Sequence, residues 1–266
     1  MPGERIRTKK AHPLSIATNF VTDDVTQPPL LVYSGDELDF SDEVLFTVLN
    51  KHLPYFSTLS EYKRNAFLYR LRIFISLKTF VIHDKSGFRE MPILLSATAI
   101  KLSMGLEKFE LPHYTSIHIF PAEFIGVHPT LRVLSGNVSG NSIHISWKHF
   151  LEGYKLPDDG QNVGLHEMAH AYYYQNFETD DEADDYFVSQ FKRFNTIGKE
   201  IFEQEKNNTT PFYSSYALTN FQEFWAESVE LFFEKPERFK NGYPALYAVM
   251  VKVLNQNPLE KTPNYG

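Results

Sequence analysis

Two histidines four residues apart are the part of this sequence whose types and spacing best suit chemistry. His166 and His170 stand in the segment LHEMAHAYYY, residues 165–174. A helix with 3.6 residues per turn places both imidazoles on one face, so their nitrogen atoms can converge on a single ion. Glu167 follows the first histidine and is rotated from it by roughly 100° around the helix. The pattern therefore predicts a metal site bordered by a carboxylate.

Hydrolysis is the chemistry that such a site would perform. The pentapeptide HEMAH fits the HExxH pattern, in which both histidines bind zinc and the glutamate is a general base. Zinc lowers the pKa of water from about 15.7 toward about 7, and Glu167 would take the proton as the water attacks a peptide carbonyl. Leu165, Met168 and Ala169 favour a buried helix over a solvated face on which this spacing arose by chance.

A third zinc ligand has to come from elsewhere in the chain. A catalytic zinc site usually has three protein ligands and one open position. The metzincin continuation needs glycine at position 173 and histidine at position 176, where this chain has Tyr173 and Asn176. The chain contains no cysteine, which excludes thiolate ligands. A carboxylate on a second helix is the alternative.

Three glutamates in residues 216–233, YALTNFQEFWAESVELFF, are candidates for this ligand: Glu223, Glu227 and Glu230. The first two share a helix face and the third lies three residues further on, so spacing alone leaves the ligand open. Position favours Glu223, because a first-turn carboxylate among aromatic residues would be costly without a cation. A helix dipole also favours a glutamate there without any metal. Glu227 is the rival, either as ligand or as the acceptor that orients a ligating histidine.

Hydrophobic periodicity predicts the elements that would position these residues. Apolar residues recur at helical spacing after residue 41 and again around 67–74, which predicts two amphipathic helices. A third helix is expected from Pro92 to about Gly105. Strand-like runs follow at 116–120 and 141–147, the second after a turn rich in glycine and asparagine. Further helices are predicted over 161–175, 181–205, 220–233 and 236–254. Helices, then a small sheet, then helices indicate an α+β class.

The chain is predicted to contain one domain after an extended start. Residues 1–40 contain four prolines and no sustained period, which predicts an extended lead-in. Residues 41–266 are predicted to be a single domain, with helices over 41–110, the sheet over 111–150 and the active-site helices over 161–254.

Composition limits the partners and the location. Lys and Arg number 26 against 33 Asp and Glu, a net charge of −7, so nucleic acid is not an expected partner. No uncharged run approaches the roughly 20 residues that span a bilayer, and the first residues lack the apolar stretch of a signal peptide. We therefore expect a cytoplasmic protein that does not insert into membranes.

On these motifs the chain resembles the Mlc-titration factor A family of gluzincin zinc metallopeptidases. The resemblance runs from about residue 49 to about residue 254, and it is most specific in NSIHISW and GQNVGLHEMAH, which look like the family's edge strand and metal helix. The segment YALTNFQEFWAESVELFF is similar to the family's tyrosine followed seven residues later by an acidic ligand. One departure is the run of tyrosines at 172–174, where family members commonly have a Lys-Leu-Asp-like stretch.

The resemblance implies a role for each residue of the site. His166, His170 and Glu223 would bind one zinc ion, and Glu167 would be the general base. Tyr216, which spacing alone suggests is a packing residue, would stabilise the oxyanion.

The resemblance also implies a zincin-like fold and a class of substrate. The family's fold is similar to the catalytic domain of anthrax lethal factor, in which a substrate strand lies along the edge of a small sheet. The matching strand here covers 141–147, so the backbone of Ile143, His144, Ile145 and Ser146 would pair with a peptide. Aminopeptidase-like hydrolysis of short peptides is the implied activity. The alternative is a regulatory protein that binds and sequesters a transcriptional repressor.

Overall fold

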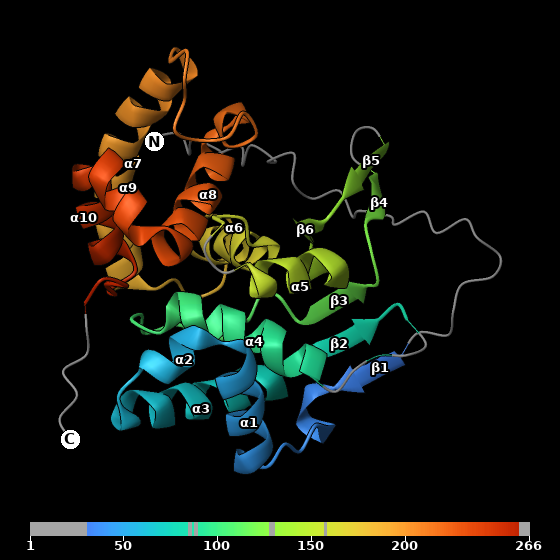
Figure 1. Ribbon diagram of the computed structural model, residues 1–266. Coiled ribbons are helices and arrows are strands. Elements are labelled where there is room, and N and C mark those ends of the chain that lie inside the picture. The colour runs from blue at the N-terminus through green and yellow to red at the C-terminus, as the bar shows by residue number, and fades with distance from the viewer. Residues whose placement is uncertain (1–30, 85–86, 88–89, 128–130, 157–158, 261–266) are drawn as a thin grey trace, which may run out of the picture.

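The α+β class predicted from the sequence is confirmed by the computed structural model of the chain (Figure 1). It describes residues 31–84, 87, 90–127, 131–156 and 159–260. These residues form ten α-helices, two short 3-10 helices and seven strands. Residues 1–30 of the predicted lead-in lie outside the described part of the chain.

A five-stranded mixed sheet lies to one side of the helices, in the order β1-β2-β3-β7-β6 (Figure 1). Its strands are β1 (Leu31–Ser34), β2 (Thr79–Ile82), β3 (Ser116–Phe120), β7 (Ser142–Ser146) and β6 (Gly136–Ser139). The inner pairs β2–β3 and β3–β7 are parallel, whereas β1 and β6 pair antiparallel at the two edges. The predicted small sheet is therefore present, but it begins earlier in the chain, since β1 falls in the predicted lead-in and β2 in the predicted helical part.

The strand predicted to be the substrate edge is an inner strand. β7 pairs with β3 on one side and with β6 on the other, so both rows of its backbone groups are already used. The prediction that the backbone of Ile143, His144, Ile145 and Ser146 pairs with a peptide is therefore wrong. The edge of the sheet at this end is β6, the glycine- and asparagine-containing segment that the sequence indicated only as a turn.

The helices form two groups along the chain. The N-terminal group comprises α1 (Asp42–His52), α2 (Pro54–Thr58), α3 (Glu61–Ser76) and α4 (Glu90–Ser103). The C-terminal group comprises α5 (Trp147–Lys155), α6 (Val163–Phe177), α7 (Asp185–Lys206), α8 (Phe221–Glu234), α9 (Pro236–Gly242) and α10 (Pro244–Val253). Trp147, predicted as the end of a strand, begins α5. The single helix predicted over 236–254 is two helices, because Pro244 starts a new one.

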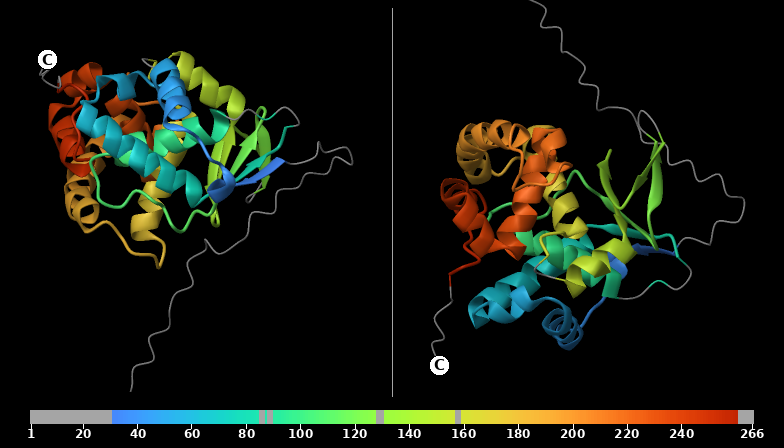
Figure 2. Two further views of the ribbon diagram at one scale, coloured as in Figure 1. Left: turned by 90° about the horizontal axis from the view of Figure 1, so that it is seen from below. Right: turned by 45° about the horizontal axis from the view of Figure 1, so that its top comes forward.

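The central helix of the structure is α6, which the right-hand view of Figure 2 shows between the sheet and α7–α10. The Asn162 side chain caps it by accepting a hydrogen bond of 3.0 Å from the Leu165 amide. Ten of its 15 residues are buried. Trp225 on α8 donates its indole N–H to the Ala169 carbonyl at 3.0 Å. This bond holds together the two helices that carry the predicted zinc ligands.

Two remaining features complete the fold. A separate antiparallel pair, β4 (Phe124–Val127) and β5 (Leu131–Leu134), is drawn above β3 in Figure 1. None of the helices in the described residues is both long enough and apolar enough to cross a membrane.

Candidate metal centre

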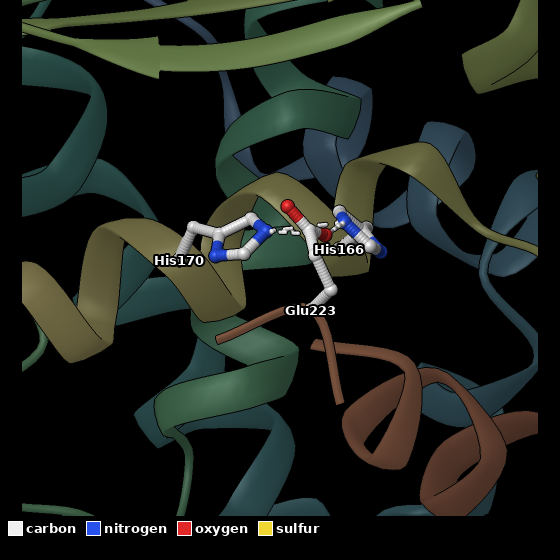
Figure 3. A group of neighbouring side chains, drawn as sticks. All are labelled: His166, His170 and Glu223. Atoms are coloured by element: carbon white, nitrogen blue, oxygen red, sulfur yellow. Dashed lines mark hydrogen bonds and ion pairs between the residues drawn. The ribbon is translucent and has the colours of Figure 1, made fainter. Parts of the chain in front are cut away.

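Three side chains from two helices converge on one point (Figure 3). His166 and His170 project from α6 and Glu223 from the first turn of α8. The two Nε2 atoms lie 3.1 Å apart, and Glu223 Oε2 lies 2.9 Å from the first and 3.1 Å from the second. Two imidazole nitrogens and one carboxylate oxygen form a donor set that suits zinc. Among the described residues, no other group of three such donors is close enough to share an ion.

The start of α8 determines where Glu223 points. The Asn220 side chain accepts a hydrogen bond of 3.0 Å from the Glu223 amide and so caps the helix at this residue. The carboxylate therefore lies in the first turn, and the Trp225 bond holds that turn against α6. The structure brings the predicted third ligand to the two histidines.

The carboxylate that orients His166 is Glu230, and the prediction of Glu227 for this role is wrong. His166 Nδ1 lies 2.7 Å from Glu230 Oε1. Glu227 instead accepts hydrogen bonds from the backbone amide of Ser214, at 2.8 Å, and from its hydroxyl. Glu230 follows Glu223 by seven residues, close to two helical turns, but Glu227 follows it by four and shares the same helix face, so spacing alone does not separate the two.

Glu167 lies between α6 and the edge strand β6. Its side chain is buried, with 6% of the residue exposed. A Cβ atom added at Gly136 would lie only 2.3 Å from Glu167 Oε1, so glycine leaves the space that this carboxylate occupies. Burial raises the pKa of Glu167 to about 8; His166 opposes this shift, and Glu223 and Glu230 add to it. In the metal-free centre the carboxyl group therefore binds a proton more tightly than an exposed glutamate does.

In the metal-free centre, His166 and Glu223 each favour the charged form of the other. Burial disfavours protonation of His166, but its bonds with Glu223 and Glu230 outweigh burial and raise its pKa. Burial would raise the pKa of Glu223, yet its bonds with both histidines lower it. Glu223 is therefore an anion that pairs with positive charge, as a ligand of a divalent metal would.

His170 is positioned by packing. Its Nδ1 atom is buried and has no hydrogen-bond partner among the described residues. The Tyr174 ring stacks on its imidazole, with centroids 6.0 Å apart and planes at 13°. Of the other two tyrosines in the run, Tyr172 donates to the Lys108 carbonyl at 2.7 Å and Tyr173 packs on Phe177. Only one of the three tyrosines thus stacks on a predicted zinc ligand.

Tyr216 lies beside the centre, immediately before the 3-10 helix Ala217–Thr219. Its ring centroid is 6.1 Å from that of His166, and 57% of the residue is exposed. Partial burial raises its pKa, and the charges of Glu223 and Glu167 act in the same direction. The structure therefore brings all five residues predicted for metal binding and catalysis into one neighbourhood.

Comparison with known proteins agrees with this geometry. The family model of the glucose-regulated metallo-peptidases M90 matches residues 37–254, a range that contains the whole centre. The chain is also 23% identical over 253 residues to an uncharacterised protein of Synechocystis sp., over 84% of this chain and 90% of that protein. The resemblance to Mlc-titration factor A is confirmed by the family match. The chain belongs to the glucose-regulated metallo-peptidase M90 family.

Proposed function

We propose that the protein is a zinc-dependent peptidase of the gluzincin type, with Glu167 as its general base. The observation that carries the proposal is the convergence of His166, His170 and Glu223 from two helices, with Glu167 beside them. Membership of a metallopeptidase family supports it. A zinc ion held by these ligands would act as a Lewis acid and make water nucleophilic near neutral pH.

The protein's own groups would move the proton and stabilise the developing charge. Glu167 would accept the proton of the attacking water and pass it to the leaving amine; a cation at the centre would lower its pKa from the metal-free value of about 8 and so favour the ionised form that a base requires. Tyr216 would donate its hydroxyl to the oxyanion, since its raised pKa keeps the phenol protonated. Glu230 would keep the His166 ring in the orientation that directs Nε2 toward the ion.

The edge strand β6 is the proposed place for the substrate backbone. In the described part of the chain, no strand pairs with its outer side. Gly136 begins β6 directly against the Glu167 carboxylate, so an added peptide strand would run past the general base. Recognition through main-chain bonds would tolerate many side chains. Aminopeptidase-like action, a cytoplasmic location and binding to a transcriptional repressor stay predictions.

A peptide-library digest followed by mass spectrometry tests this function. The samples are the wild type, Glu167→Gln and a control variant, Glu178→Gln, which alters an exposed glutamate after α6. We expect Glu167→Gln to retain zinc and to cleave at least about 100-fold more slowly, while the control cleaves normally. Products that begin at the substrate's second residue would support aminopeptidase action. Wild-type cleavage rates in Glu167→Gln would contradict the proposed mechanism.

A further inference from the structure

A cavity of about 780 Å³ lies away from the metal centre. Its lining includes residues of α2, α3, α4, α8 and α10, the start of α6 and the segment that follows α10. None of the three predicted zinc ligands lines it. Its volume falls in the range of roughly 300–1,000 Å³ that is common for small-molecule sites. The cavity is therefore large enough for a ligand that the proposed peptidase reaction does not use.

One wall of the cavity carries a carboxylate whose hydrogen bonding is incomplete. Glu234, at the end of α8, is 7% exposed. Its Oε1 atom accepts a hydrogen bond of 2.7 Å from Asn162 Nδ2, whereas its buried Oε2 atom has no partner among the described residues. Burial also raises the pKa of this group. A positively charged donor beside Glu234 would supply the missing bond and stabilise the anion.

The cavity is also lined by an ammonium group that lies over two aromatic rings. Lys101 Nζ is 5.1 Å from the Phe233 centroid and 5.9 Å from the Tyr55 centroid. Burial lowers the pKa of Lys101 and Glu234 raises it, yet the two charges are not within ion-pair distance. The rings stabilise a cation but accept no ordinary hydrogen bond. Among the described residues, no carboxylate lies within ion-pair distance of Lys101 Nζ, so the charge of Glu234 acts on it only from a longer distance.

We propose that this cavity binds a small zwitterion, whose ammonium pairs with Glu234 and whose carboxylate pairs with Lys101, and that binding is coupled to the metal centre. The remaining lining suits this ligand. Met104, Leu165 and Val251 provide apolar surface for a side chain. Besides Lys101 and Glu234, the lining contains three basic side chains, Lys63, Arg70 and Lys252, and one further carboxylate, Glu260. The protein as a whole has a net charge of −7. The excess of basic side chains in the lining favours the carboxylate end of the ligand.

A short chain of hydrogen bonds connects the cavity with the predicted zinc ligand His166. Glu234 binds the Asn162 side chain, the Asn162 amide donates to Glu230 Oε2, and Glu230 Oε1 contacts His166 Nδ1. Asn162 is also the cap of α6. A ligand that moves Glu234 would therefore shift both the start of α6 and the carboxylate that orients His166. By thermodynamic linkage, zwitterion and zinc would change each other's affinity by the same factor.

Calorimetry on the metal-free wild-type protein tests the site without any substitution. L-Leucine is the zwitterionic probe, 3-methylbutylamine is the same molecule without the carboxylate, and 4-methylpentanoate is the same molecule without the ammonium. We expect L-leucine to bind at least about 10-fold more tightly than either control, since each control leaves one buried charge without a partner. No binding of L-leucine, or equal binding of a control, would overturn the proposal.

Substitutions then locate the site. Glu234→Gln and Lys101→Met should each weaken L-leucine binding at least about 10-fold. Glu237→Gln and Lys240→Met, at exposed positions of α9 outside the cavity lining, should not change it. Binding that survives both cavity substitutions would overturn the location.

The coupling has its own measurement, a zinc titration with and without saturating L-leucine. We expect the zinc Kd to change about fivefold or more in the wild type and to stay unchanged in Glu234→Gln. A zinc Kd that L-leucine leaves unchanged in the wild type would overturn the coupling. The same titration is made with Glu167→Gln, which should bind zinc without hydrolysing peptides. Coupling measured in this variant therefore does not depend on the proposed hydrolysis.

Discussion

His166 Nδ1 lies 2.7 Å from Glu230 Oε1, so α8 supplies both the carboxylate at the candidate metal centre and the one that contacts the other nitrogen of the predicted ligand His166. Glu223 and Glu230 are seven residues apart and contact the two nitrogen atoms of a single imidazole. This bridge makes the register of α8 against α6 decisive for the geometry of the centre.

Removing the charge of Glu230 should weaken zinc binding. Glu230→Gln replaces the anionic acceptor of His166, and we expect zinc affinity to fall about 10- to 100-fold in competition with a chelator of known affinity. Glu227→Gln is the matched control, since Glu227 bonds Ser214 and not a histidine. Equal losses in the two variants would show that Glu230 has no special role.

The glycine at the start of β6 should be required for catalysis. Gly136→Ala places a methyl group where Glu167 lies, so the carboxylate must move. Because misplacement by about 1 Å can cost 100-fold in rate, we expect kcat to fall about 10- to 100-fold while zinc is retained. Gly198→Ala in α7, where the nearest atom to the added carbon is 3.4 Å away, is the control. Normal kcat in Gly136→Ala would refute the close approach of Glu167.

Three neighbouring histidines, one directly after β2 and the others on β3 and β7, should make the fold sensitive to acid. His83 Nε2 and His118 Nδ1 are 3.1 Å apart, and the rings of His118 and His144 are centred 4.8 Å apart. Burial, with the neighbouring His118 charge second, lowers the pKa of His83 to about 4 and that of His144 to about 3. Unfolded histidine titrates near 6.5, so the unfolded chain binds more protons as the pH falls below about 6.5. The free energy of unfolding should therefore decrease as the pH falls from about 6.5 toward the pKa values of His83 and His144 in the folded protein.

Urea unfolding of metal-free protein at about pH 7.5, 6.5 and 5.5 checks this effect. His144→Gln removes the most buried of the three titrating rings, which is 1% exposed. The variant should lose less stability than the wild type between the highest and the lowest pH, whatever its stability at the start. Parallel losses would indicate that His144 does not contribute.

Lys78 should stabilise the loop that leads into β3. Its buried Nζ donates to the carbonyls of Glu110, Leu111 and Tyr114, each at 2.7 Å, and Leu111 has a positive φ of 49°. Lys78→Met leaves these acceptors without the donor, so the free energy of unfolding should fall by about 3 kcal/mol or more. Lys192→Met, at an exposed position of α7, should change it by less than about 0.5 kcal/mol in the same urea titration. A similar small change in Lys78→Met would contradict this account.

Local periodicity was sufficient for most of the helices, though not for α5 or for the break at Pro244, and for most of the residues that meet at the centre. HEMAH has the spacing that puts two imidazoles on one face of α6, and the apolar pattern of residues 220–233 predicts α8 to within one residue at either end. The choice between Glu227 and Glu230 was beyond local pattern. It depends on the angle at which α8 crosses α6, which tertiary contacts such as the Trp225 bond determine.

The sheet was harder to predict because its edges are short. β1 and β6 have four residues each, and Gly136 and Asn137 are typical of turns. Pairing with β7 makes this segment a strand, and pairing is a long-range property that a local window does not contain. The resemblance alone predicted β7 to be the edge, and local pattern did not reveal β6 as a strand beside it.

The central claim is tested most directly by titrating zinc into protein from which a chelator has removed the metal. Zinc content and peptide hydrolysis are measured on the same samples. For the wild type, we predict that the rate rises with zinc and saturates at one ion per chain. Glu167→Gln should bind the same single ion and stay at least about 100-fold less active. Full hydrolysis by the chelated wild type, or by zinc-loaded Glu167→Gln, would contradict a zinc peptidase that uses Glu167 as its base.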